Sequence, residues 1–196
     1  MQGEAIPGDW TVRELLDALA ERTPAPGGGA AAACAGAVGA ALIEMAARFS
    51  LAQGDVGTPM ADVLERAGEL RARLLELGEV ELRAFAPVLA AQRLPRDDPE
   101  RAARLRSARS SAAQSPFEIA GATAELAELA AELSRTGNPN LEGDAVTGCL
   151  LAEAACRAAA RLVEINLPDG EEDLRVRRAE DLSRRALVAR DRALRG

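Results

Sequence analysis

The sequence predicts an all-α protein, an antiparallel bundle of about six helices. Only 2% of the residues are aromatic, and long stretches consist of Ala, Leu, Glu and Arg, which are strong helix formers. No alternating apolar and polar pattern typical of a strand, and no internal repeat, interrupts these stretches. A chain of 196 residues is long enough to bury a core of its own, so we expect residues 1–196 to form one helical domain.

Start and stop signals divide the chain into these six helices. Asp and Thr caps, prolines at first helical positions, and glycine- or asparagine-rich breaks mark the expected ends. Pro87 and Pro116 lack an amide N–H; Pro87 is expected to kink the third helix near its end, and Pro116 to kink or divide the fourth. The helices are expected at about residues 11–22, 29–53, 58–92, 98–134, 144–166 and from the turn LPDGEED to the C-terminus, with caps at Asp9 or Thr11, Thr58, Asp98 and Asp144.

The second expected helix is unusually rich in small residues. Its apolar run over residues 30–43 ends before Glu44 and is shorter than the ~18–20 residues that a membrane span needs, which favours a buried core helix and no membrane. Glycine inside a helix costs about 1 kcal/mol relative to alanine. Gly36 and Gly39 therefore predict close approach of another helix.

Charge and composition exclude several functions. The net charge is −7, so the chain is a poor candidate for binding nucleic acid. The chain contains neither His nor Lys, which removes the commonest general base and metal ligand and leaves carboxylates, thiols, backbone or water for proton transfer. Cys34, Cys149 and Cys156 are odd in number and follow no secretory signal; we expect free thiols in a cytoplasmic protein, and no metal site.

Three short motifs each allow a functional and a purely structural interpretation. The glycines of PAPGGG offer unhindered N–H groups at a helix N-terminus, where an anion binds well, or they form a flexible loop. In GEVELRAF, Glu81 shares a helix face with Phe85 and is either a base with a raised pKa or part of a solvated surface, and Glu79 lies nearby. GNPN with Asp144 supplies amides for a heterocycle, or a turn and a helix cap.

Taken together and in this order, the motifs resemble one family, the formiminotetrahydrofolate cyclodeaminases and methenyltetrahydrofolate cyclohydrolases. The resemblance extends from about Trp10 to Asp169. It is carried by five spaced segments: LLDALAERTPAPGGG, EVELRAFAPVLAAQRLPR, SPFEIA, GNPNLEGDA and VEINLPD.

The resemblance implies an all-α homodimer that acts on a folate one-carbon unit. In the cyclohydrolase reaction water adds to the cationic methenyl carbon and the ring opens to 10-formyltetrahydrofolate. In the cyclodeaminase reaction N10 attacks the formimino carbon and ammonia leaves. Both reactions need a base and a negative or dipolar surface that stabilises the cation, and neither needs a metal or redox cofactor. The chain lacks a fused formiminotransferase segment, which favours the cyclohydrolase.

The resemblance also suggests roles for individual residues. Glu81, or else Glu79, takes the place of the proton-accepting aspartate, and Asp144 joins them as a catalytic carboxylate. The remaining residues are expected to bind the substrate: Pro26, Gly27, Gly28, Gly29, Arg96, Asn138, Asn140 and Asn166.

The chain departs from the family pattern at three places. Ala30 replaces a serine after the glycines, glutamates replace the aspartate pair, and AQGDVGTP replaces a basic segment expected to hold the folate's glutamate tail. These departures motivate an alternative, a non-catalytic folate-binding or scaffold protein with the same dimeric fold. A related enzyme for a different amidine or pterin is also compatible with the sequence.

Overall fold

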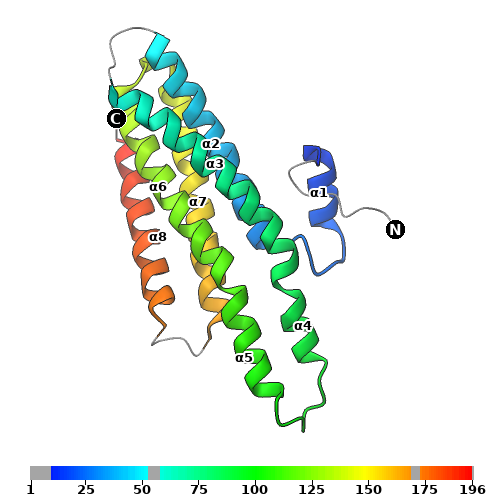
Figure 1. Ribbon diagram of the computed structural model, residues 1–196. Coiled ribbons are helices and arrows are strands. Elements are labelled where there is room, and N and C mark those ends of the chain that lie inside the picture. The colour runs from blue at the N-terminus through cyan, green and yellow to red at the C-terminus, as the bar shows by residue number, and fades with distance from the viewer. Residues whose placement is uncertain (1–9, 53–57, 169–172, 196) are drawn as a thin grey trace.

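The computed structural model describes residues 10–52, 58–168 and 173–195. Within these residues all regular structure is helical, which confirms the predicted all-α class (Figure 1). The elements are α1 Val12–Ala20, α2 Gly28–Ala52, α3 Thr58–Ala84, α4 Ala86–Gln92, α5 Arg101–Ala112, α6 Gln114–Thr136, the 3₁₀ turn η2 Pro139–Leu141, α7 Glu142–Asn166 and α8 Leu174–Ala193.

The described residues form eight α-helices where six were expected, because two of the expected helices are each divided. The expected third helix breaks at Phe85, just before Pro87, into α3 and α4. The expected fourth breaks at Ala113, just before Pro116, into α5 and α6. Because proline cannot donate the i→i−4 hydrogen bond, each long helix is interrupted at a single residue, Phe85 or Ala113, whose backbone stays in the right-handed helical region.

Two predicted caps are wrong in their details. Asp144 does not cap α7, because the side chain of Asn138 accepts a hydrogen bond from the Asn140 N–H at 2.9 Å and starts η2, which leads directly into α7 at Glu142. Asp144 lies in the first turn instead, where a carboxylate still favours the helix dipole. Asp98 likewise caps a turn, and α5 begins only at Arg101.

The start of α1 agrees with the prediction. Thr11 and Glu14 form a capping box, in which the Glu14 N–H donates to Thr11 Oγ1 at 3.2 Å and the Thr11 N–H donates to the Glu14 carboxylate at 2.7 Å. The alternative cap, Asp9, lies outside the described residues. The helix ends at Ala20, two residues earlier than expected, where the chain turns extended at Glu21.

The core lies around α2, which packs against α3, α6 and α7, while α8 covers α6 and α7 (Figure 1). A Cβ atom added at Gly39 would lie 2.9 Å from the Gly148 carbonyl oxygen, and one at Gly148 would lie 3.0 Å from that of Gly39. A Cβ atom at Gly36 would lie 2.6 Å from Thr123 Cγ2. The expected close helix packing at Gly36 and Gly39 is therefore confirmed.

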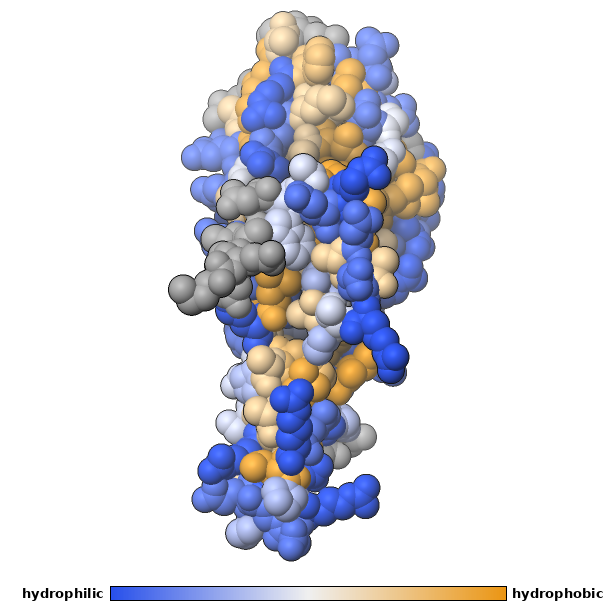
Figure 2. Space-filling model, turned by 90° about the vertical axis from the view of Figure 1, so that its right-hand side faces the viewer, coloured by the Kyte–Doolittle hydropathy of each residue, from blue (hydrophilic) through white to orange (hydrophobic). Residues whose placement is uncertain are grey.

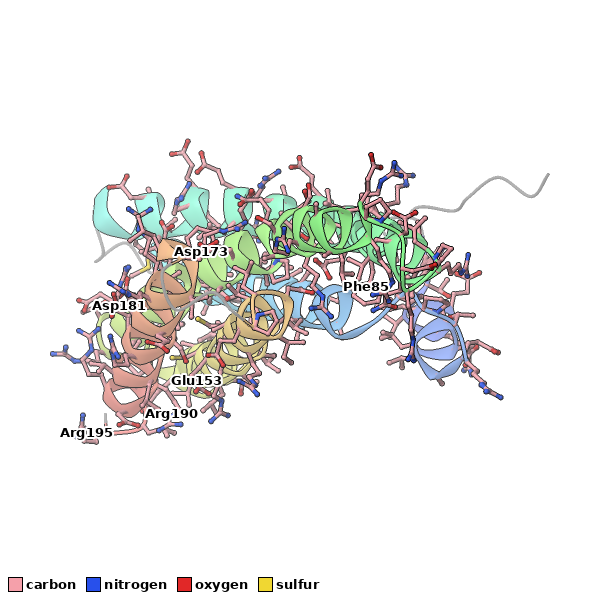
Figure 3. All side chains as sticks on the ribbon, turned by 90° about the horizontal axis from the view of Figure 1, so that it is seen from below. Phe85, Glu153, Asp173, Asp181, Arg190 and Arg195 are labelled. Carbon is pink, nitrogen blue, oxygen red and sulfur yellow. The ribbon has the colours of Figure 1, made fainter. Side chains whose placement is uncertain are left out.

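By length and composition α2 is apolar enough to cross a membrane, but 61% of its most apolar window is buried inside the bundle. Its Glu44 side chain is only 4% exposed and forms ion pairs with Arg48, at 2.8 Å, and Arg71. Glu153 on α7 is also buried and faces Arg190 of α8, and the two are labelled side by side in Figure 3. The charges of these two buried acids are therefore balanced by arginines within the protein.

Two parts of the chain stand apart from the main bundle. The α4 and α5 helices form a hairpin that extends beyond one end, where the molecule narrows (Figures 1 and 2). Helix α1 stands away from the bundle and buries none of its residues. The cysteines are free, as expected: Cys149 and Cys156 are buried and Cys34 is half-buried.

Candidate functional site

The break between α5 and α6 organises the candidate site. Pro116, the third residue of α6, has no N–H to donate to the carbonyl of Ala112, four residues earlier. The side-chain amide of Asn166, at the end of α7, donates to this oxygen instead, at 3.3 Å. The break therefore ties Asn166 to the last residue of α5.

Glu81 reaches the same junction from α3. The hydroxyl of Ser115, on the second residue of α6, donates a hydrogen bond to Glu81 Oε1. The other carboxylate oxygen, Oε2, lies against Gly29 in the first turn of α2, where an added Cβ atom would overlap the carboxylate and lie 2.9 Å from Glu81 Cγ. Three helices thus meet at this one acid, and a side chain at Gly29 would displace the Glu81 carboxylate.

The surroundings of Glu81 suit a general base. Burial raises the pKa of its carboxyl, and the hydrogen bond from Ser115 partly offsets that rise. Glu79 lies two residues earlier, roughly 200° around α3, and has no hydrogen bond or ion pair in the described chain. Of the two candidate carboxylates, the structure therefore brings only Glu81 to the glycines of α2.

The PAPGGG segment forms the N-terminus of α2. Helix α2 begins at Gly28, and the Gly27 carbonyl accepts its first hydrogen bond, from the Ala31 N–H at 3.0 Å. The amides of the first turn have no partner within the helix and carry its positive dipole end. A Cβ atom at Gly27 would meet no atom within 4 Å, so this end is open beside Glu81, whereas Pro26 is buried.

A cavity of about 280 Å³ adjoins Asn166. Arg106, Arg109 and Ser110 line it from α5, and Asp173 lines it from the start of α8. Asp173 is already paired with Arg175, at 2.8 Å, and Arg175 also donates to the Ser110 carbonyl and hydroxyl at 2.8 Å.

Arg109 is distinctive among the arginines. It is half-buried, and in the part of the chain that the structure describes it has no hydrogen bond or ion pair, unlike the other half-buried arginines. Arg106, Arg109 and Ser115 were not among the residues predicted from the sequence. Ser115 stands directly before the mid-helix proline of SPFEIA, a signal that could have drawn attention to it; nothing separates the two arginines from the other twenty-two.

The other predicted site residues lie elsewhere in the chain. The Asn138 N–H donates to Ser50 Oγ at 2.8 Å, near the C-terminal end of α2. Asn140 is exposed and Asp144 half-buried on the same loop and helix start. Because α2 is 25 residues long, about 37 Å, these three residues and the Glu81 group lie at opposite ends of the bundle.

Arg96 is also separated from Glu81. It is exposed at the tip of the α4–α5 hairpin, beyond α4, which alone is about 10 Å long. A single chain therefore brings together Pro26, Gly27, Gly28, Gly29, Glu81 and Asn166, and does not bring Arg96, Asn138, Asn140 or Asp144 to them. Across the described ranges, no group of three or more Cys, Asp or Glu side chains is placed to hold a metal ion.

Comparison with known proteins gives a consistent result. A family model described as formiminotransferase-cyclodeaminase matches residues 11–184. A methenyltetrahydrofolate cyclohydrolase from Methylorubrum extorquens is 34% identical over 166 residues, which cover 81% of this chain and 80% of that protein. A solved formiminotetrahydrofolate cyclodeaminase from Thermotoga maritima is 26% identical, with a TM-score of 0.85 over 96% of both chains.

A longer relative matches as well. The formimidoyltransferase-cyclodeaminase of Mus musculus is 29% identical over 173 residues, which cover 85% of this chain but 32% of the mouse protein. The chain thus spans about a third of the length of that relative.

Proposed function

Because the chain belongs to the formiminotransferase-cyclodeaminase family, we propose that it is a folate one-carbon enzyme that hydrolyses 5,10-methenyltetrahydrofolate to 10-formyltetrahydrofolate. The observation that carries this proposal is the placement of Glu81, a half-buried carboxylate oriented by Ser115 beside the glycine N-terminus of α2. The cyclohydrolase is preferred because the relative with that name is more similar in sequence, at 34% identity against 26% for the Thermotoga maritima cyclodeaminase.

In the proposed reaction Glu81 takes a proton from water as the water oxygen bonds to the cationic methenyl carbon. The carbon–N5 bond of the resulting adduct then breaks. The proton on Glu81 passes to N5, and the hydroxyl proton leaves to solvent, so that one proton is released in all. A base with a raised pKa suits both steps, because it accepts the proton more readily than an ordinary carboxylate and can then return it to N5.

A second candidate reaction is the cyclodeamination of formiminotetrahydrofolate, for which the Thermotoga maritima protein is named. There N10 would attack the formimino carbon as Glu81 accepts the N10 proton, and Glu81 would pass that proton to the formimino nitrogen, which leaves as ammonia. Neither reaction changes an oxidation state, and a carboxylate base suffices for the proton transfers, so we propose that no metal or redox cofactor takes part. Gly27, Gly28, Gly29 and Asn166 are the proposed folate contacts in the same chain, and the cavity at Arg106 and Arg109 is proposed for the folate's glutamate carboxylates.

We further propose that this single-domain chain acts in the cytoplasm as a homodimer that associates through α2 and α7. The accessible positions of α2 from Gly28 to Leu42 carry no charge, and Val38, Phe49 and Leu150 are 56%, 53% and 38% exposed. Such an uncharged face is unusual on a chain with 28% charged residues and suits a second copy. Helix α1, with Val12 76% exposed, adds a second apolar surface on that side (Figure 1).

An antiparallel dimer explains the separation of the predicted site residues. A two-fold axis perpendicular to α2 near its midpoint exchanges the two ends of the helix. The Asn138, Asn140 and Asp144 group of one chain then lies near the Glu81 group of its partner. We expect Val38→Glu to yield monomers in analytical ultracentrifugation, and the matched Val188→Glu on α8, at a residue 55% exposed, to leave dimers.

The proposed activity is tested by following the near-ultraviolet absorbance of 5,10-methenyltetrahydrofolate with enzyme and without it, and by measuring ammonia release from formiminotetrahydrofolate. We expect Glu81→Gln to lower kcat by about 10²-fold or more, and Glu76→Gln, an exposed change on the same helix, to have little effect. Glu79→Gln, compared with Glu81→Gln, shows which of the two carboxylates is the base. Folate binding without turnover would instead support the non-catalytic alternative.

The pH dependence follows from the direction of the Glu81 pKa. The base works only when deprotonated, and burial places its pKa above the ordinary 4.5. We therefore expect kcat/KM to fall as the pH decreases through this raised pKa, with the acid limb above pH 4.5 and absent in Glu81→Gln.

A further inference from the structure

We propose that Ser115 is a positioning residue that holds the Glu81 carboxylate in its reactive orientation. The proposal rests on the proposed function of Glu81 as the base. The side chain of a glutamate has one more rotatable bond than that of an aspartate, so a glutamate base needs an additional constraint to keep its carboxylate in one place. In this chain the constraint comes from α6 on one side and α2 on the other.

The geometry assigns different tasks to the two carboxylate oxygens. Oε1 accepts the hydrogen bond of Ser115, whose side chain is buried, with the residue only 4% exposed. Oε2 lies against Gly29 at the open N-terminus of α2. Oε2 is therefore the oxygen free to take the proton, and Ser115 directs it toward the side from which a substrate approaches.

No other side chain shares this task in the described residues. Ser115 is the hydrogen-bond partner of Glu81, and α2 carries no charge from Gly28 to Ile43. The nearest acid on α6, Glu118, is paired with Arg73, and on α7 Arg161 is paired with Glu164. Loss of the Ser115 hydroxyl would leave the carboxylate without a donor and without a nearby charge to fix it.

The test compares the pH profile of kcat/KM in five variants. Ser115→Ala removes the donor that favours the ionised carboxylate, so its acid limb should move to higher pH by about one unit, with kcat lowered about tenfold. Ser115→Thr keeps a hydroxyl and should restore the wild-type limb. Ser134→Ala is the control, because that hydroxyl donates to Ala131 of its own helix at 3.1 Å. In Glu81→Asp the carboxylate is withdrawn from α6, so adding Ser115→Ala should change little.

The outcomes separate this proposal from the one on which it rests. If Glu81→Gln keeps wild-type activity, Glu81 is not the base and the proposed function fails, whatever Ser115 does. If Glu81→Gln is inactive but Ser115→Ala keeps the wild-type acid limb and kcat, the role of Glu81 as the base is supported and the positioning role of Ser115 is wrong. Circular dichroism of each variant verifies that the helices remain.

Discussion

At the scale of single residues, Gly29 shows how little space the site leaves. A side chain there would enter the volume of the Glu81 carboxylate, so Gly29→Ala should displace the base and lower kcat by about 10²-fold, because catalysis is sensitive to ~1 Å. Gly121→Ala on α6 is the matched control, since a Cβ atom there meets nothing within 4 Å. Steady-state kinetics measure both, and equal activity of the two variants would contradict the tight contact.

Arg109 carries a prediction about substrate binding. If its half-buried guanidinium pairs with a glutamate carboxylate of the folate, Arg109→Gln should raise KM about tenfold and leave kcat nearly unchanged. The exposed Arg135 on α6 also has no partner among the described residues, so Arg135→Gln is a suitable control. A substrate that ends at the benzoate, without glutamate, should not distinguish Arg109→Gln from wild type. An equal loss with both substrates would rule out the assigned contact.

These residues differ in how far the sequence could predict them. Glu81 and Gly29 could be predicted, because each lies in a motif, GEVELRAF or PAPGGG, that the sequence singled out. The structure places these two residues next to each other. Ser115 and Arg109 could not be found in this way. The Ser115 contact joins residues 34 apart and depends on how α3 packs against α6, and the isolation of Arg109 depends on which acids its neighbours have already paired with.

At the scale of elements, the break between α5 and α6 predicts an energetic coupling between Pro116 and Asn166. In the wild type, Asn166→Ala leaves the buried carbonyl of Ala112 without its donor and should cost about 1 kcal/mol, or roughly 2–4 °C in Tm. Pro116→Ala adds an N–H that can donate to the same oxygen. In that background Asn166→Ala should therefore cost much less.

Thermal and urea denaturation of the wild type, the two single variants and the double variant measure this cycle. Additive costs would show that Asn166 does not replace the missing proline donor. The proline itself was readable from the sequence, as was the kink. The hydrogen bond that replaces the missing proline N–H could not be predicted, because its donor, Asn166, lies 54 residues after Ala112. The start of α7 was misplaced for a different, local reason: the Asn138 side chain forms a turn that precedes the helix.

At the scale of the whole molecule, the two groups of predicted site residues lie at opposite ends of the long helix α2. Gly28 and Glu81 lie at its N-terminal end, and Ser50 contacts Asn138 at the other. The bundle buries α2 among α3, α6 and α7 but leaves one uncharged face uncovered, with Val38 near its midpoint. The sequence predicted a helical bundle and the site motifs, but it could not show that a single chain places the Asn138 group and Glu81 at opposite ends of α2.

An antiparallel dimer with shared sites predicts complementation between inactive chains. Glu81→Gln and Asp144→Asn should each abolish most activity alone. In a mixed dimer, one site combines both changes, while the other combines the intact Glu81 of one chain with the intact Asp144 of its partner. Mixed dimers isolated through two different affinity tags should therefore show about half of the wild-type kcat, and an unsorted equal mixture about a quarter. Mixed dimers with no more activity than their parents would place both residues' roles within a single chain and contradict the shared site.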